Sequence, residues 1–350
     1  MKRVIASASL AALGAVGVQA AGYSPGFGST DLSKPWSVSA TLRGFYDDNY
    51  NTAPSGSVAK RDSFGFNVRP SASIAWSNDQ TDVGARYTMG MYYFEDRPKN
   101  KEDFTHQFDA FLSHNFSPRL NLYVSDAFVV AQEPEVLAQQ GAITIPYRTK
   151  GDNIRNNASL NLNAQVTQLL TLVLGYQNTI FDYSQSAKDV VSAVNPIGGG
   201  SHSALLDRME NLMLANLRWQ ALPATVAVAG YQFGIIDYTA NEYLMGGLLP
   251  FGIPKSNIRD SYNHYIYAGV DHTFNPDLKV SLRGGAQYTD LHRQTYTDWG
   301  PYANASLQYR YAVGSYAEVG FMQSFSPTEI LANNISASVG LKDCMKPTSA

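Results

Sequence analysis

The sequence predicts an all-β protein, a transmembrane up-and-down antiparallel β-barrel of about 14 strands, within a range of about 12 to 16. Three observations favour this fold class. Apolar and polar residues alternate with a period of two along most of the chain, short and long connections follow one another in turn, and only 16% of the 350 residues are charged. No segment supplies the roughly eighteen consecutive apolar residues that a membrane helix needs.

A strand is expected wherever apolar residues recur at every second position. In the first one, Trp36, Val38 and Leu42 share one face, and Ser37 and Arg43 share the other. The expected strands span residues 36–50, 63–76, 83–94, 104–116, 120–130, 153–166, 170–181, 206–219, 225–238, 261–274, 278–289, 299–311, 316–325 and 334–341.

The connections distinguish a barrel from a soluble sandwich. Tight turns are expected at 77–82, 117–119, 167–169, 220–224, 275–277 and 312–315, and mostly longer loops at 51–62, 95–103, 131–152, 182–205, 239–260, 290–298 and 326–333. A Greek-key sandwich would mix these lengths, whereas an outer-membrane barrel has short periplasmic turns and long external loops. The strands are also long enough to cross a bilayer at a tilt.

A barrel fold determines which face of each strand meets lipid and which meets water. A membrane barrel turns its apolar face to lipid and its polar face to the lumen. We therefore expect Leu160 and Leu162 against lipid, and Asn161 and Asn163 in the lumen. Aromatic residues at the ends of the apolar faces indicate two interfacial girdles, and they include Trp36, Tyr46, Phe64, Trp76, Phe104, Phe116, Trp219, Phe274 and Trp299.

The chain begins with the features of a cleaved export signal. Lys2 and Arg3 precede a short apolar run that ends in a small-residue cleavage pattern at 18–20. The expected organisation is a signal peptide at 1–21, a periplasmic leader at 22–35, a barrel at 36–342 and a C-terminal tail at 343–350. Cys344 is the only cysteine, so no intramolecular disulfide braces the fold.

Two short stretches and the strand layout resemble a known family. The run Gly44-Phe45-Tyr46-Asp47-Asp48-Asn49, the FNPDL turn at 274–278 and the strand-turn layout resemble the outer-membrane β-barrel porins associated with exopolysaccharide export and exosortase systems of Gram-negative bacteria. The resemblance implies an outer-membrane location and a link to surface polysaccharide.

The C-terminus departs from the pattern of the wider class, in which the last strand commonly ends on an aromatic residue. Here Pro347 lies in a polar tail, which is either a short periplasmic extension or an altered end of the gene.

The polar faces carry the candidate functional residues. The inward set that we expect to line the lumen is Arg43, Arg69, Arg86, Asp109, Arg155, Arg208, Glu210, Arg218, Asp271, Lys279, Arg283, Arg310 and Glu318, with Asp47 at the rim. Basic residues outnumber acidic ones, although the formal net charge of the chain is -3. Either these ions pair and hold the barrel rigid, or they line a mildly anion-favouring passage. Inward tyrosines at 123, 265, 267 and 302 offer stacking surface for sugar rings or fill space.

Other candidate residues favour a structural role. His106 and His114, like His264 and His272, lie eight positions apart on an apolar face, which places each pair at the two membrane interfaces. A Ca²⁺ site at Asp47, Asp48 and Asn49 lacks the EF-hand spacing, and the glycines at 198–200 lack the rest of a phosphate loop. The sequence therefore indicates no catalytic residue, no metal site and no cofactor.

The leading hypothesis is a porin-like passage or anchor for small or saccharide solutes that makes no covalent change to them. An outer-membrane hydrolase or acyltransferase and a structural or adhesive surface barrel are the alternatives. The expected partners are outer-membrane lipid, the barrel assembly machinery and polysaccharide or small anionic solutes. The charge balance gives no reason to expect nucleic acid.

Overall fold

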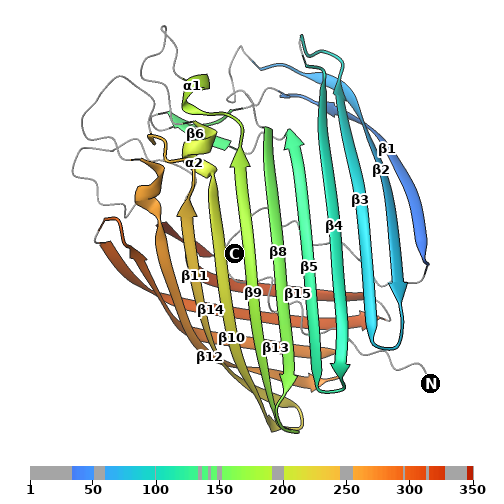
Figure 1. Cartoon of the computed structure of the whole chain (residues 1–350), viewed down its shortest axis with the longest axis vertical. Helices are drawn as coiled ribbons and strands as arrows, with labels where there is room; N and C mark the ends of the chain where they lie inside the picture. Colours follow the sequence, from blue (N-terminus) through green and yellow to red (C-terminus); the bar gives the residue numbers. More distant parts are fainter. Residues whose placement is uncertain are drawn as a thin grey trace.

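The computed structural model describes residues 34–50, 60–98, 100–132, 136–140, 143–147, 152–190, 201–244, 255–294, 296–312, 315–327 and 345–349. One curved antiparallel sheet of 14 strands contains most of them (Figure 1). Neighbouring strands of this sheet are consecutive in the chain, except that β6 and β7, which form a separate two-stranded sheet, lie in the connection between β5 and β8. The predicted up-and-down topology is confirmed.

Thirteen long strands form the body of the sheet. They are β1 (Trp36–Asp47), β2 (Ser63–Ser77), β3 (Thr81–Phe94), β4 (Glu102–Ser117), β5 (Leu120–Gln132), β8 (Asp152–Gln165), β9 (Leu170–Tyr183), β10 (Arg208–Leu222), β11 (Thr225–Tyr238), β12 (Ser261–Asn275), β13 (Leu278–Leu291), β14 (Tyr296–Ala312) and β15 (Ser315–Pro327). Each coincides with a predicted strand, and their ends differ by three residues or fewer.

The end of the sheet differs from the prediction. A short strand, β16 (Met345–Ser349), pairs antiparallel with β15 and places Pro347 opposite Phe325. Proline is compatible with an edge strand because no N–H is needed on the free side. This strand lies inside the predicted tail, whereas the predicted closing strand at 334–341 lies outside the described residues. Within the described part of the chain, β1 pairs with β2 alone, so the ring is not closed there.

The tight turns after β2, β4, β8 and β10 lie at one end of the sheet, the lower end in Figure 1. Short polar side chains close them by accepting backbone hydrogen bonds. Asn78 Oδ1 accepts from the amides of Gln80 and Thr81, and Asn275 Oδ1 accepts from those of Asp277 and Leu278. These Asx turns explain why two-residue reversals form at these positions.

The opposite end carries the longer connections, which contain helices and strands where the sequence predicts loops. They contain the hairpin β6 (Val136–Gln140) and β7 (Ile143–Tyr147), the helices α1 (Ala187–Val190) and α2 (His202–Leu206), and the 3-10 helix η2 (Ser256–Arg259). Ser201 caps α2 by accepting from the amide of Ala204 at 3.1 Å.

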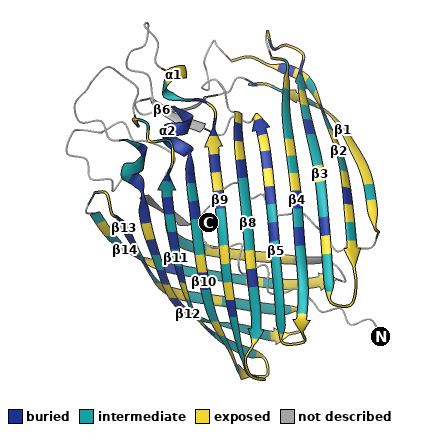
Figure 2. Cartoon of the chain, viewed as in Figure 1, coloured by how far each residue is buried: buried dark blue, intermediate teal, exposed yellow. Residues whose placement is uncertain are grey.

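Burial alternates along the strands as the period-two pattern requires (Figure 2). The outer face keeps large apolar side chains exposed, such as Leu42 at 74% and Leu160 at 40%. The inner face buries polar side chains, such as Asn161 at 7% and Gln232 at 0%. The structure therefore has the predicted arrangement, with apolar residues outside and polar residues inside, which is the reverse of that in a soluble protein.

Candidate functional site

The inner face of the sheet gathers the predicted charged residues, and one three-strand ion network organises its middle. Arg218 Nη2 on β10 lies 2.9 Å from Asp271 Oδ2 on β12, and Arg283 Nη2 on β13 lies 2.7 Å from Asp271 Oδ1. Ser281 adds a hydrogen bond of 2.8 Å to the same carboxylate. The ions therefore pair along one wall, where Asp271 joins β12 to its neighbour β13 and, across β11, to β10.

A second set of charges is deeply buried on the same face. Arg208 Nε donates to Glu210 Oε1 at 2.6 Å, and both side chains are nearly inaccessible. Asp109 is 2% exposed, accepts two hydrogen bonds from Gln107 Nε2 and lies opposite Arg86 in the β3–β4 register. Arg155 is also buried, at 5% exposure. These residues occupy the packed part of the inner wall.

The inward tyrosines fill space on the wall formed by β12 and β14. Tyr265, Tyr267 and Tyr302 are 3% to 6% exposed and pack on one another. Tyr267 Oη donates to Asn216 Oδ1 at 2.6 Å and accepts from Gln232 Nε2 at 3.0 Å. Tyr123 on β5 stacks on Phe111, with ring centroids 6.3 Å apart. The three clustered tyrosines are therefore buried and fill space, and their rings do not offer an exposed stacking surface for sugars.

A different group of predicted residues remains open to solvent. Arg43 on β1, Arg69 on β2, Arg310 on β14 and Glu318 on β15 are exposed on the inner face. Within the described residues, none of these four side chains has an ion pair or hydrogen bond. Lys279 lines a small pocket with Asp277 and Arg310 at the tight-turn end. These four exposed residues lie on strands near the two edges of the described sheet, and three of them are basic.

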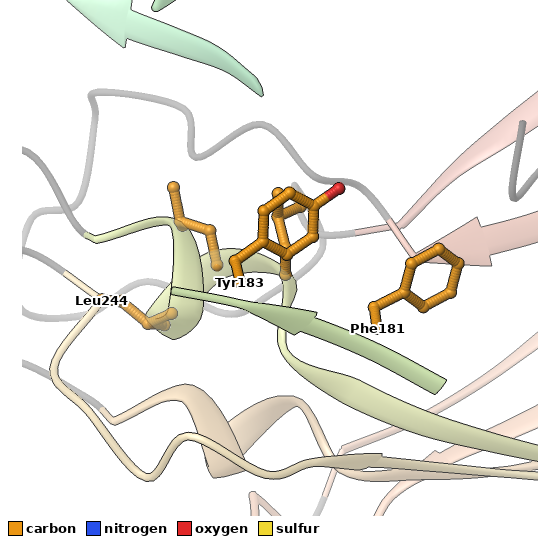
Figure 3. Packing of buried hydrophobic residues seen from close by; sticks show 5 residues of the cluster. Phe181, Tyr183 and Leu244 are labelled. Atoms are coloured by element: carbon orange, nitrogen blue, oxygen red, sulfur yellow. The ribbon is translucent and has the colours of Figure 1, made fainter. Parts of the chain in front are cut away.

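An apolar cluster organises the loop end above the inner face (Figure 3). Phe181, Tyr183, Leu205, Leu206 and Leu244 are buried together, and they come from β9, α2 and the connection after β11. We call this cluster, together with α2 and η2, the cap.

One arginine and one acid hold the cap in place. The Arg259 guanidinium donates to the carbonyls of Ala204 and Leu205 at 2.8 Å each, and so binds the C-terminal end of α2. Glu242 Oε2 accepts from the hydroxyls of Ser201 and Ser203. No local sequence pattern indicates these contacts, because they join residues 39 to 55 positions apart along the chain.

The four strand histidines form hydrogen bonds on the outer face. Tyr87 Oη lies 2.7 Å from His106 Nδ1, and Tyr231 Oη lies 2.7 Å from His264 Nδ1. Near the tight turns, Thr81 Oγ1 and Thr225 Oγ1 each lie 2.8 Å from the Nδ1 atoms of His114 and His272. The two strand pairs thus repeat one arrangement. The placement of these rings at the two membrane interfaces stays a prediction.

The acidic rim after β1 pairs with a lysine. Lys60 Nζ lies 2.5 Å from Asp48 Oδ2, and Asp47 Oδ1 accepts from the Asn49 amide at 2.9 Å. Among the described residues, no group of three or more His, Cys, Asp or Glu side chains is arranged to hold a metal ion. In the same part of the chain, no helix is long and apolar enough to span a membrane.

These features define the class of protein: an up-and-down antiparallel barrel sheet with an apolar outer face and a charged inner face. No protein-family model matches the sequence, and no curated protein matches it. Among solved structures, 74 chains match.

Three of these structures illustrate the similarity. The ferric enterobactin receptor PfeA of Pseudomonas aeruginosa is 11% identical over 83% of this chain, with a TM-score of 0.45, and this chain spans only 44% of that receptor. The toluene transporter TbuX of Ralstonia pickettii is 10% identical over 83% of both chains, with a TM-score of 0.34. The KdgM porin is 9% identical over 79% of this chain and 100% of its own, with a TM-score of 0.28. These similarities concern the fold alone.

Proposed function

We propose that the chain is an outer-membrane β-barrel that provides a water-filled, mildly anion-favouring passage for small or saccharide solutes. The observation that carries the proposal is the inverted burial pattern. Apolar side chains such as Leu42 and Val319 are 74% and 70% exposed on the outer face, while charged side chains occupy the inner face. That distribution is stable in a bilayer and unfavourable in water.

The charge that remains accessible supports an anion preference. Arg43, Arg69 and Arg310 are exposed on the inner face, whereas Glu318 is the exposed acid of the predicted lumen set. A basic surface inside a wall of low dielectric constant concentrates small anions. The Arg218–Asp271–Arg283 network supports a rigid wall rather than a mobile one.

The finer parts of the proposal rest on the sequence. The signal peptide at 1–21 would direct export, and the barrel assembly machinery would insert the strands with the tight turns in the periplasm. The resemblance to barrels associated with exopolysaccharide export favours saccharides as solutes, and the basic residues of the inner face favour acidic ones. Solutes would pass without covalent change, so we expect neither a cofactor nor catalysis.

Planar-bilayer recording of the purified protein tests the proposal. Folding is first confirmed by heat-modifiable gel mobility, and the heat-denatured sample serves as the control. We expect stepwise conductance with a reversal potential displaced toward that of the anion under a KCl gradient. Folded protein that gives no conductance in bilayers and no swelling of liposomes in small sugars would contradict the proposal.

A further inference from the structure

In the middle of the described strands, the outer face carries a polar patch among residues that are otherwise mainly apolar or aromatic. The patch consists of Asp126 on β5, Asn156 on β8, Asn178 on β9 and Asn211 on β10. Asn156 Nδ2 donates to Asp126 Oδ1 at 2.8 Å, and Asn178 Nδ2 donates to Asn211 Oδ1 at 2.9 Å. In the strand register, Asp126, Ala158, Asn178 and Asn211 follow one another across four strands.

The patch lies inside the apolar band, since apolar residues flank it along the strands. On β5, Phe128 and Val130 follow Asp126 on the same face and are 38% and 37% exposed. On β9, Ile180 follows Asn178 and is 37% exposed. An acid and three amides at this depth are costly against lipid tails, so a lipid-facing Asp needs a partner.

The outer face of β5, β8, β9 and β10 differs in its hydrogen-bonded pairs from equivalent positions elsewhere in the sheet. The seventh residue of β3, β5, β9 and β11 in each case hydrogen-bonds to the next strand on the outer face. On β3 and β11 that pair is Tyr with His, two aromatic rings that present a largely apolar body and hydrogen-bond to each other through their polar atoms. On β5 it is Asp126 with Asn156, and on β9 it is Tyr176 with Asn211.

The chemistry of the patch argues against a lipid phosphate as its partner. The basic residues of β5, β8, β9 and β10 are Arg155, Arg208 and Arg218, which all alternate onto the inner face. A phosphate group would therefore meet Asp126 with no cation on that wall to bind it. The partner must instead supply neutral donors at the level of the hydrocarbon.

We propose that this patch is the contact between two copies of the chain. Within the described residues, Asp126 Oδ2 has no hydrogen-bond donor and the Asn211 amide has no acceptor for its N–H groups. A surface with both unused donors and unused acceptors satisfies itself when two copies meet through a two-fold axis. Asparagine side chains likewise hydrogen-bond across the interfaces of membrane helices. This inference rests on the part of the proposed function that places the outer face against lipid. It does not require that the barrel conducts ions.

Mass measurement in lipid nanodiscs tests the proposal. We expect the wild type to be a dimer, and the variant carrying Asp126→Leu, Asn156→Leu, Asn178→Leu and Asn211→Leu to be a monomer that retains heat-modifiable mobility. The matched control carries Tyr87→Leu, His106→Leu, Tyr231→Leu and His264→Leu, which removes as many polar groups from the other walls and should stay dimeric. A wild type that is monomeric, or a patch variant that remains dimeric, overturns the proposal.

Cross-linking in native outer membranes gives a second measurement that needs no change to the patch. In a Cys344→Ser background, Leu160→Cys lies beside the patch and Leu282→Cys lies on the β13 wall, with wild-type side chains 40% and 47% exposed. A short bifunctional thiol reagent should join two chains through position 160 and not through position 282. Equal cross-linking at both positions, or none at 160, contradicts the interface.

Discussion

At the scale of single residues, Asp207 links the cap to the barrel strands. Its Oδ1 accepts from the Tyr183 amide at 2.7 Å, its own amide donates to the Ser203 carbonyl, and its carbonyl accepts from the Thr239 amide. Burial raises the pKa of Asp207 to about 7, with smaller contributions in the same direction from Asp182 and Glu242. The hydrogen bond from Tyr183 and the charge of Arg208 oppose this rise.

The raised pKa predicts that acid strengthens the cap. The folded cap binds the proton of Asp207 more tightly than the unfolded chain does, so its stability is fully present below pH about 4 and declines as pH rises toward 7. The slope is at most about 1.4 kcal/mol per pH unit. Amide hydrogen exchange of Tyr183 and α2, corrected for intrinsic rates, should be slower at pH 5 than at pH 7.5. Asp207→Asn keeps an acceptor for Tyr183 and should remove this pH dependence, and an unchanged dependence would contradict the assignment.

At the scale of elements, the long strands could be predicted because alternation and tight turns are local signals. Asn78 and Asn275 close their turns with their own side chains, so neighbouring residues are enough to locate the reversals. The cap could not be predicted in this way. The helix α2 has five residues and is held by Arg259, which lies more than 50 residues away along the chain.

The same distinction applies to the candidate site. Alternation predicts that Arg218, Asp271 and Arg283 point inward, but their pairing depends on the register of three strands. The sequence likewise left the role of Tyr265 and Tyr302 open, since burial at 5% and 3% arises from packing between strands. Sequence patterns therefore indicate the face of a residue, and tertiary contacts decide its role.

Strand β8 offers a test of the two faces with adjacent positions. Leu162 lies on the outer face, in register with Leu122 and Leu174, and Asn163 lies on the inner face. Leu162→Arg should lower the free energy of unfolding by about 1 kcal/mol, less than at the midplane, because the charge meets lipid three residues from the turn end of β8. Asn163→Arg should cost much less, since its side chain points into the lumen. Urea unfolding in liposomes measures both, and equal losses would contradict the assigned faces.

At the scale of the whole molecule, the inner wall separates charges that hold the sheet together from charges that face the passage. Arg283 is 9% exposed and bound to Asp271, so Arg283→Gln should lower the free energy of unfolding by roughly 1.5 to 3 kcal/mol. Arg43, Arg69 and Arg310 are exposed and make no ion pair within the described residues. Replacing these three with Gln should leave stability nearly unchanged.

The triple Gln variant, although nearly unchanged in stability, should differ from the wild type in its ion selectivity. The three exposed arginines concentrate anions in the passage, so the triple Gln variant should shift the reversal potential toward cations under a salt gradient. Glu318→Gln provides the matched control, because removing an exposed acid from the same face should shift it toward anions. Both shifts should shrink as salt rises, since the Debye length falls from about 10 Å at 0.1 M to about 3 Å at 1 M. A triple variant with unchanged selectivity and full conductance would show that ions cross the barrel away from this basic surface, and that the accessible arginines of β1, β2 and β14 do not line the passage.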